Sequence, residues 1–134
     1  MNGRTLLALL GFTALLSMSM GYVGAQQLQG VESTELAVVD LGPHFECLEG
    51  MVLKMTYHKI GPQVSGGQHS HLGRPEVFYV LDGSIVEHQN GTSREYSAGE
   101  GFVSNADLTK EHRIENASDS VATVMDIQIV SADR

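Results

Sequence analysis

Apolar and polar residues alternate in short runs along most of the chain. Successive residues of a strand point to opposite faces of a sheet, so a period of two is typical of strands that bury one face. The expected strands cover residues 37–41, part of 47–60, 76–81, 84–88, 92–96, 102–104, 112–116 and 121–130. Residues 26–35 are polar, and we expect them to form a loose leader.

Turn signals separate these strands, notably Asp82-Gly83 and Asn90-Gly91, which are typical of tight hairpins. No segment of ten or more residues carries a helical stripe of apolar side chains. Strands that recur about every ten residues predict an antiparallel sandwich or barrel.

The alternation also assigns side chains to faces of the expected sheet. In the second strand the apolar face, expected to lie in the core, carries Met51, Leu53, Met55 and Tyr57, and the polar face carries Lys54, Thr56 and His58. In the next long strand Glu76 shares a face with Phe78 and Val80. If these two apolar residues face the core, they carry the Glu76 carboxylate inward, where it needs a partner.

The first 25 residues read as a secretory signal peptide. Arg4 gives a positive start, residues 5–23 carry no charge, and Val23-Gly24-Ala25 resembles a cleavage site. The alternative is a retained membrane anchor, because these nineteen residues would span about 28 Å as a helix. Cleavage predicts a domain over residues 26–134, exported to the periplasm or secreted, with no stable membrane insertion.

Composition narrows the function classes. The chain has 134 residues, 42% hydrophobic and 18% charged, which fits one globular domain. Eight basic residues against 16 acidic ones give a net charge of −8, which argues against nucleic-acid binding. Cys47 is the single cysteine, which excludes an intrachain disulfide, and we expect it to be buried as a small apolar residue.

The six histidines are the most informative residues. His69 and His71 are two positions apart, so on a strand both imidazoles reach one point. Glu76 follows after a turn, and His112 opens a later strand and supplies a third nitrogen. Such a mixed nitrogen and oxygen site suits one divalent first-row transition metal: Mn, Fe, Co, Ni, Cu or Zn. The alternatives are that the His pair lies on a partly exposed loop, where it serves solubility, and that Glu76 is a surface carboxylate.

These residues also carry a resemblance to a known family. His69-Ser70-His71, Glu76 and Gly83 resemble the first motif of the cupin superfamily, and Gly99, His112 and Asn116 resemble its second motif. The spacer between the two motifs is similar to that of small single-domain bacterial cupins. Gln63 replaces a motif glycine, and Asn105 and Asp107 replace the usual Pro and Gly ahead of His112, which lies two residues later than is common.

The resemblance implies a jelly-roll β-barrel with His69, His71, Glu76 and His112 as metal ligands. It also implies an enzyme similar to the quercetin-dioxygenase-like group, in which Glu76 acts as a general base. Tyr57, Phe78 and Ile114 are candidates for the lining of a substrate pocket. His44, His58 and His88 are expected at the surface.

Three function classes stay open on the sequence. One is an exported metal-dependent oxygenase or related enzyme acting on a small organic substrate, and another is a non-catalytic barrel that binds a small ligand or metal. The third is a metal-free interaction barrel in which the His cluster is residual. Cupins often pair through their sheets, so a homodimer is a further option. Because export places metal loading outside the cytoplasm, we expect intrinsic affinity to favour Zn or Cu over Mn or Fe.

Overall fold

The computed structural model describes residues 29–104 and 111–133, which form a nearly all-β jelly roll. The strands are β1 (Val31–Asp40), β2 (Met51–Ile60), β3 (Val64–Ser65), β4 (Glu76–Asp82), β5 (Ser84–Gln89), β6 (Thr92–Ser97), β7 (Gly101–Ser104), β8 (His112–Asn116) and β9 (Ala122–Ser131). A single 3-10 turn, η1 (Glu46–Leu48), lies between β1 and β2. The antiparallel barrel predicted from the strand spacing is therefore confirmed.

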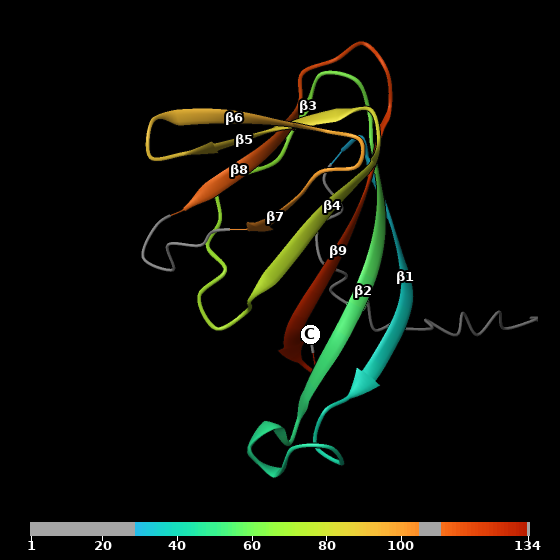
Figure 1. The fold of residues 1–134 in the computed structure, drawn as a ribbon, viewed down its shortest axis with the longest axis vertical. Helices are drawn as coiled ribbons and strands as arrows, with labels where there is room; N and C mark the ends of the chain where they lie inside the picture. The colour runs from blue at the N-terminus through green and yellow to red at the C-terminus, as the bar shows by residue number, and fades with distance from the viewer. Residues whose placement is uncertain (1–28, 105–110, 134) are drawn as a thin grey trace, which may run out of the picture.

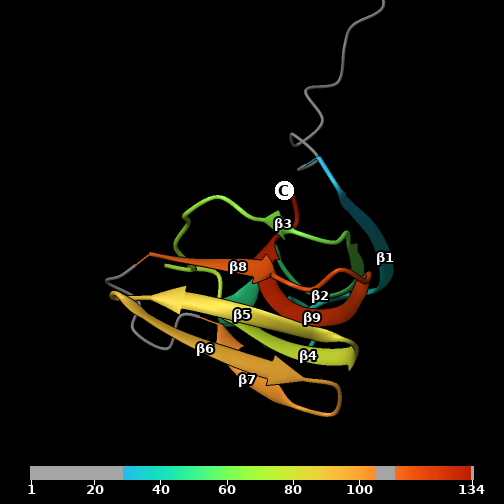
Figure 2. The same ribbon diagram turned by 90° about the horizontal axis from the view of Figure 1, so that it is seen from above.

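The strands form two antiparallel sheets. The larger has the order β1-β2-β9-β4-β7 and the smaller the order β3-β8-β5-β6. Figure 1 shows the smaller sheet at the upper end of the long strands β2, β4 and β9, and Figure 2, seen from above, shows it as a second layer. The barrel interior lies between the two layers.

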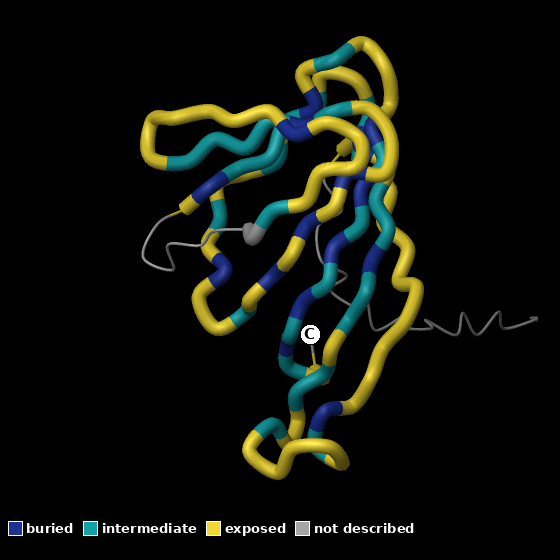
Figure 3. The backbone as a smooth tube through the Cα atoms, in the orientation of Figure 1, coloured by how far each residue is buried: buried dark blue, intermediate teal, exposed yellow. Residues whose placement is uncertain are grey.

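Apolar side chains from both sheets fill one part of this interior. The buried cluster consists of Ile60, Phe78, Val80, Ala122 and Val124 from the larger sheet, with Ile85 and Tyr96 from the smaller. In Figure 3 buried residues alternate with exposed ones along the first part of β4 and with half-buried ones along β9. β9 shows the clearest alternation, because every second residue from Ala122 to Val130 is buried.

Two residues of the cupin-like motifs have a structural role. Gly83 has a φ of 77° in the turn between β4 and β5, and a Cβ there would lie 3.2 Å from the Cα of Ala122. Asn116 is fully buried at the end of β8, where its Nδ2 donates hydrogen bonds to the carbonyls of Ile60, Gly61 and Ser120 at 2.8–3.0 Å. These contacts fix the end of β2 beside the β8–β9 turn.

The predicted orientation of β2 is wrong. Thr56 and Ile60 are buried, His58 faces the interior, and Leu53 is 36% exposed on the other face. Ile60 belongs to the core cluster, so residues at even positions share its inward orientation. The polar face of β2 therefore points into the barrel, and its more apolar face points outward.

Three smaller expectations also need correction. Residues 31–35 belong to strand β1 rather than to a loose leader, because they pair with β2 in register. Cys47 is exposed in η1, outside the core. The short strand β3, which pairs with β8, was not expected.

The signal peptide expected at residues 1–25 lies outside the described residues. Within the described part of the chain, no helix has the length and apolar character that crossing a bilayer requires.

Candidate metal centre

Three histidines from two distant segments meet at one point. His69 and His71 lie between β3 and β4, and His112 is the first residue of β8. One ring nitrogen from each can be chosen so that all three lie within 4.8 Å of one another, and the ring centroids are 4.7–4.9 Å apart. The backbone supports this meeting, because His69 and His112 exchange N–H to carbonyl hydrogen bonds of 2.9 Å.

Hydrogen bonds behind the rings orient two of the imidazoles. Nδ1 of His69 lies 2.9 Å from the carbonyl oxygen of Gly67, and Nδ1 of His112 lies 2.8 Å from Oε1 of Glu87. A carbonyl or ionised carboxylate only accepts, so each Nδ1 carries the proton and each Nε2 keeps its lone pair. This is the arrangement that second-layer partners impose on metal-ligating histidines.

The inward nitrogens lack the partners that their burial requires. Nε2 of His112 is buried without a hydrogen-bond partner among the described residues. Nε2 of His69 faces Nε2 of His71 at 3.0 Å, although the His69 lone pair points there. A cation between the three rings would accept all three lone pairs at once. These residues therefore fit a metal with imidazole ligands.

The protonation state of the cluster also fits a metal. Burial lowers the pKa of His71 to about 4, and the nearby Arg74 guanidinium and the other two imidazoles act in the same direction. Burial likewise lowers the pKa of His69, against the opposing effect of its bond to Gly67. At neutral pH these rings are uncharged, which is the form that binds a metal.

Glu76, the fourth ligand expected from the sequence, lies beside this cluster. Its side chain is buried in the first residue of β4, as the parity with Phe78 and Val80 predicts. Oε2 of Glu76 is 3.5 Å from Nδ1 of His71, the ring nitrogen opposite the one that faces His69. The carboxylate is therefore placed to orient His71, and its role as a ligand stays a prediction.

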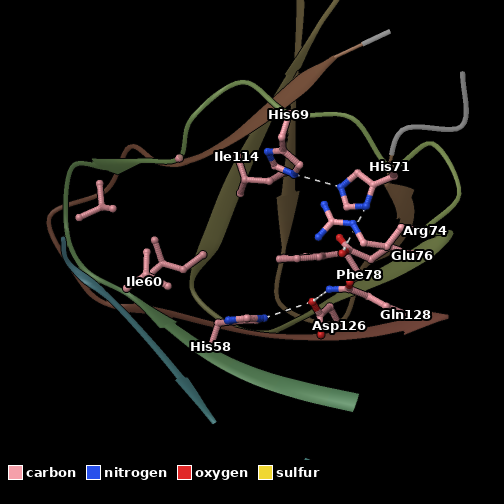
Figure 4. Close-up of a pocket in the computed structure, with 13 residues that line it drawn as sticks. His58, Ile60, His69, His71, Arg74, Glu76, Phe78, Ile114, Asp126 and Gln128 are labelled. Carbon is pink, nitrogen blue, oxygen red and sulfur yellow. Dashed lines mark hydrogen bonds and ion pairs between the residues drawn. The ribbon is translucent and has the colours of Figure 1, made fainter. Parts of the chain in front are cut away.

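His69 and His71 of the cluster line a cavity of about 350 Å³ inside the barrel (Figure 4). Phe78 and Ile114 line it, as expected for pocket residues. Tyr57 is not among the lining residues, because it lies next to the inward-facing His58 and so points to the other face of β2. A further lining residue is Arg74, which supplies a positive charge near His71.

A second polar group faces the same cavity, and the sequence reasoning missed it. Nε2 of His58 on β2 lies 3.2 Å from Oδ2 of the buried Asp126 on β9, and Gln128 donates to the same oxygen. His58 was expected at the surface, and the core position of Ile60 on the same face would have corrected this. Asp126 could have been found by its parity with Val124, and Glu87 by its parity with Ile85.

The other two histidines lie outside the cluster. His44 is exposed in the segment after β1, as expected. His88 is half-buried on β5 and lies within hydrogen-bond distance of Glu115 and Ser93.

Comparisons with solved structures agree with the observed topology. KdgF from Halomonas sp. superposes with a TM-score of 0.59 at 18% identity, over 78% of this chain and 84% of that one. A Cupin 2 conserved barrel domain protein from Salinispora arenicola gives 0.58 at 16% identity, over 82% and 88%. A cupin-superfamily protein named as a sugar phosphate isomerase, from Silicibacter pomeroyi, gives 0.59 at 18% identity, over 78% and 62%. At these identities the likeness establishes the fold.

No curated protein matches the sequence. The family model described as "Cupin domain" matches residues 56–128, which is more than half of the chain and includes both histidine segments and the strands that form the cavity. The resemblance noted from the two motifs is thus confirmed at the level of the superfamily, and the chain belongs to the cupin domain family.

Proposed function

We propose that this protein is an exported, metal-dependent cupin that binds a small organic molecule beside the metal and transforms it, with an oxygenase of the quercetin-dioxygenase-like kind as the leading reaction class. The metal would be held by His69, His71 and His112. The family match and the three-histidine cluster support the metal-binding part of this proposal.

One observation carries the functional part: two imidazoles of the cluster, those of His69 and His71, form part of the wall of the 350 Å³ cavity. A structural metal site is closed by protein ligands, whereas a catalytic site keeps positions open to water or substrate. The cavity volume is within the range of small-molecule sites, and its wall combines apolar side chains with a few polar ones. Ligand binding at the metal therefore explains the arrangement better than a purely structural role.

The residues that line the cavity would have different roles. A bound divalent metal supplies a Lewis acid for an oxygen atom of the ligand. Phe78 and Ile114 exclude water from the apolar side of the cavity, and Arg74 offers a cation to a negatively charged group. Glu76 is the carboxylate beside the cluster, and we propose it as the general base or, after a side-chain rotation, as a fourth ligand.

Elemental analysis tests the metal part of the proposal. Protein isolated from its native compartment without chelators should contain about one equivalent of Zn or Cu. His71→Ala should lower this occupancy strongly, whereas the exposed His44→Ala should not. Equal occupancy in the two variants would contradict the ligand assignment, and Mn or Fe in the native protein would contradict the expected metal preference.

The same samples test catalysis. Copper-loaded protein should consume oxygen with a small phenol or keto compound, and His71→Ala should not, because Zn²⁺ has no redox chemistry with dioxygen. A metal-loaded protein that binds such compounds without turning them over would instead be a non-catalytic binding barrel.

Export and self-association remain parts of the proposal with their own tests. Cleavage after residue 25 would appear as the N-terminal sequence of the protein recovered outside the cytoplasm. The outer face of the larger sheet exposes Leu53, Val77 and Tyr79 by 36–46%, and a second copy of the chain is the occupant that we propose for this apolar face. Sedimentation of the wild type as a monomer at micromolar concentration would contradict this dimer.

A further inference from the structure

Arg74 brings a positive charge to the wall of the cavity. The residue is half-buried, and Figure 4 shows it on the same side of the cavity as His71 and Glu76. Within the described part of the chain, its guanidinium forms no hydrogen bond or ion pair with another residue. A guanidinium keeps its charge in proteins, so a half-buried one without a partner favours an anion that enters the cavity.

The local backbone determines where Arg74 lies. Its N–H donates a 2.8 Å hydrogen bond to the carbonyl of His71, and Gly73 between them has a φ of 70°, which the third residue of a type II turn requires. The carbonyl of the next residue, Pro75, accepts a 3.1 Å hydrogen bond from the N–H of Ile129 on β9. The turn therefore ties Arg74 to a histidine of the cluster on one side and to the larger sheet on the other.

The charge of Arg74 reaches the histidine cluster. Burial is the main cause that lowers the pKa of His71 and of His69, and the guanidinium charge lowers both further. With a divalent ion at the cluster, two positive centres would lie at the same end of the cavity. A carboxylate suits such a pair, because it can place one oxygen at the metal and the other on the planar guanidinium.

The other end of the cavity is apolar. Val31, Ile60 and Val64 line it there, and Figure 4 shows Ile60 across the cavity from His71 and Arg74. Val31 and Ile60 are directly paired on β1 and β2. Ile60 belongs to the core cluster, and Val31 and Val64 pack against it. A hydrocarbon group placed at this end would be removed from water.

We propose that the cavity binds an amphipathic monocarboxylate, with its carboxylate between the metal and Arg74 and its hydrocarbon part against Val31, Ile60 and Val64. This inference rests on the proposed function, because it assumes a metal at the cluster. The volume of about 350 Å³ lies near the lower end of the range for small-molecule sites, so the hydrocarbon part is a short chain or a single ring.

A series of simple ligands tests the proposal. Butanoate, hexanoate and octanoate are compared with one another, and hexanoate with the neutral hexanamide, by calorimetry on zinc-loaded full-length protein whose zinc content is measured. Hexanoate should bind at least tenfold more tightly than hexanamide, because only the carboxylate pairs with the two positive centres. Each added CH₂ should tighten binding up to about fourfold until the apolar end is filled. Removal of zinc with a chelator should weaken hexanoate binding at least tenfold.

Variants then locate the carboxylate. Arg74→Gln keeps a hydrogen-bond donor but removes the charge, so hexanoate should bind about tenfold more weakly while hexanamide changes less than twofold. The matched control is Arg94→Gln, which removes an exposed arginine on β6 that is not among the residues lining the cavity. It should leave the affinities for both ligands unchanged.

The outcomes separate this inference from the proposed function. If zinc-loaded wild type binds hexanamide as tightly as hexanoate, binds neither, or shows no gain with chain length, the inference is wrong while the metal site stands. Equal hexanoate binding with and without zinc, or undiminished binding by zinc-loaded Arg74→Gln, also overturns it. Protein that takes up no metal refutes the proposed function and the inference with it. The wild-type comparisons decide the matter even if Arg74→Gln fails to fold.

Discussion

Glu87 offers a sharp test of how the metal site is held together. Its Oε1 lies 2.8 Å from Nδ1 of His112, which is fully buried, and the Glu87 side chain is 12% exposed. Oε2 of the same carboxylate accepts a hydrogen bond from the Tyr96 hydroxyl at 3.2 Å. Glu87→Gln keeps the shape of the side chain and an oxygen that can accept from Nδ1, but it removes the negative charge.

The size of the effect follows from the lost charge. A hydrogen bond to an ionised group contributes about 1.5–3 kcal/mol and a neutral one about 0.5–1.5 kcal/mol, so the substitution should cost about 1–1.5 kcal/mol. This corresponds to zinc affinity that is roughly tenfold lower. The value lies at the lower end of the 10- to 100-fold losses typical of partners behind metal-ligating histidines.

Competition with a chromophoric chelator at constant pH would measure this affinity. Glu95→Gln is the matched control, because Glu95 is an exposed glutamate on β6 and should have no effect. Both variants should keep the wild-type circular dichroism spectrum. If Glu87→Gln binds zinc as tightly as the control does, the claim that Glu87 strengthens zinc binding through His112 is refuted. Either His112 is then not a ligand, or the Glu87 carboxylate does not raise the basicity of the His112 imidazole.

Three further predictions concern stability. Zinc at 100 times its Kd should stabilise the fold by about 2.7 kcal/mol and raise the Tm by roughly 10 °C. An unchanged Tm in a thermal melt would indicate that the imidazoles do not bind one ion jointly. In metal-free protein, burial gives His71 a pKa of about 4, against 6.5 in the unfolded chain. Between these two values the unfolded state binds a proton that the folded state does not. The free energy of unfolding should therefore fall by up to about 3 kcal/mol as the pH is lowered from about 7 to 4. Urea titrations would measure this, and a profile equally steep in His71→Ala would contradict the assignment. Asn116→Ala leaves the carbonyls of Ile60 and Gly61 without their buried donor and should cost about 2–4 kcal/mol in the same titrations.

The sequence predicted the strands and the main histidines because both signals are local. The bounds expected for residues 112–116 agree with β8, and the spacing of His69 and His71 already placed two imidazoles on one side. Parity with Phe78 and Val80 also predicted the burial of Glu76.

The sequence could not show what the neighbouring strands bring to the site. Glu87 reaches His112 because β5 pairs with β8 in a register that places Gln89 opposite His112, and no local pattern encodes that register. In β2 hydrophobicity even favoured the wrong face, because the outward side carries Leu53 and Tyr57 while the inward side carries the polar wall of the cavity. When a strand carries apolar residues on both faces, its inward face can be assigned only once one of its own residues is known to lie in the core. In β2 that residue is Ile60.

The paired backbone bonds between His69 and His112 mean that the fold preorganises two of the three imidazoles. An antiparallel pair that exchanges both hydrogen bonds holds its Cα atoms about 5.5 Å apart whatever the side chains bind. Cation binding therefore has to order little of the backbone, and the metal-free protein should keep these two imidazoles close to the positions they take with the metal bound. Metal exchange in this barrel then becomes a matter of ligand chemistry and access rather than of refolding.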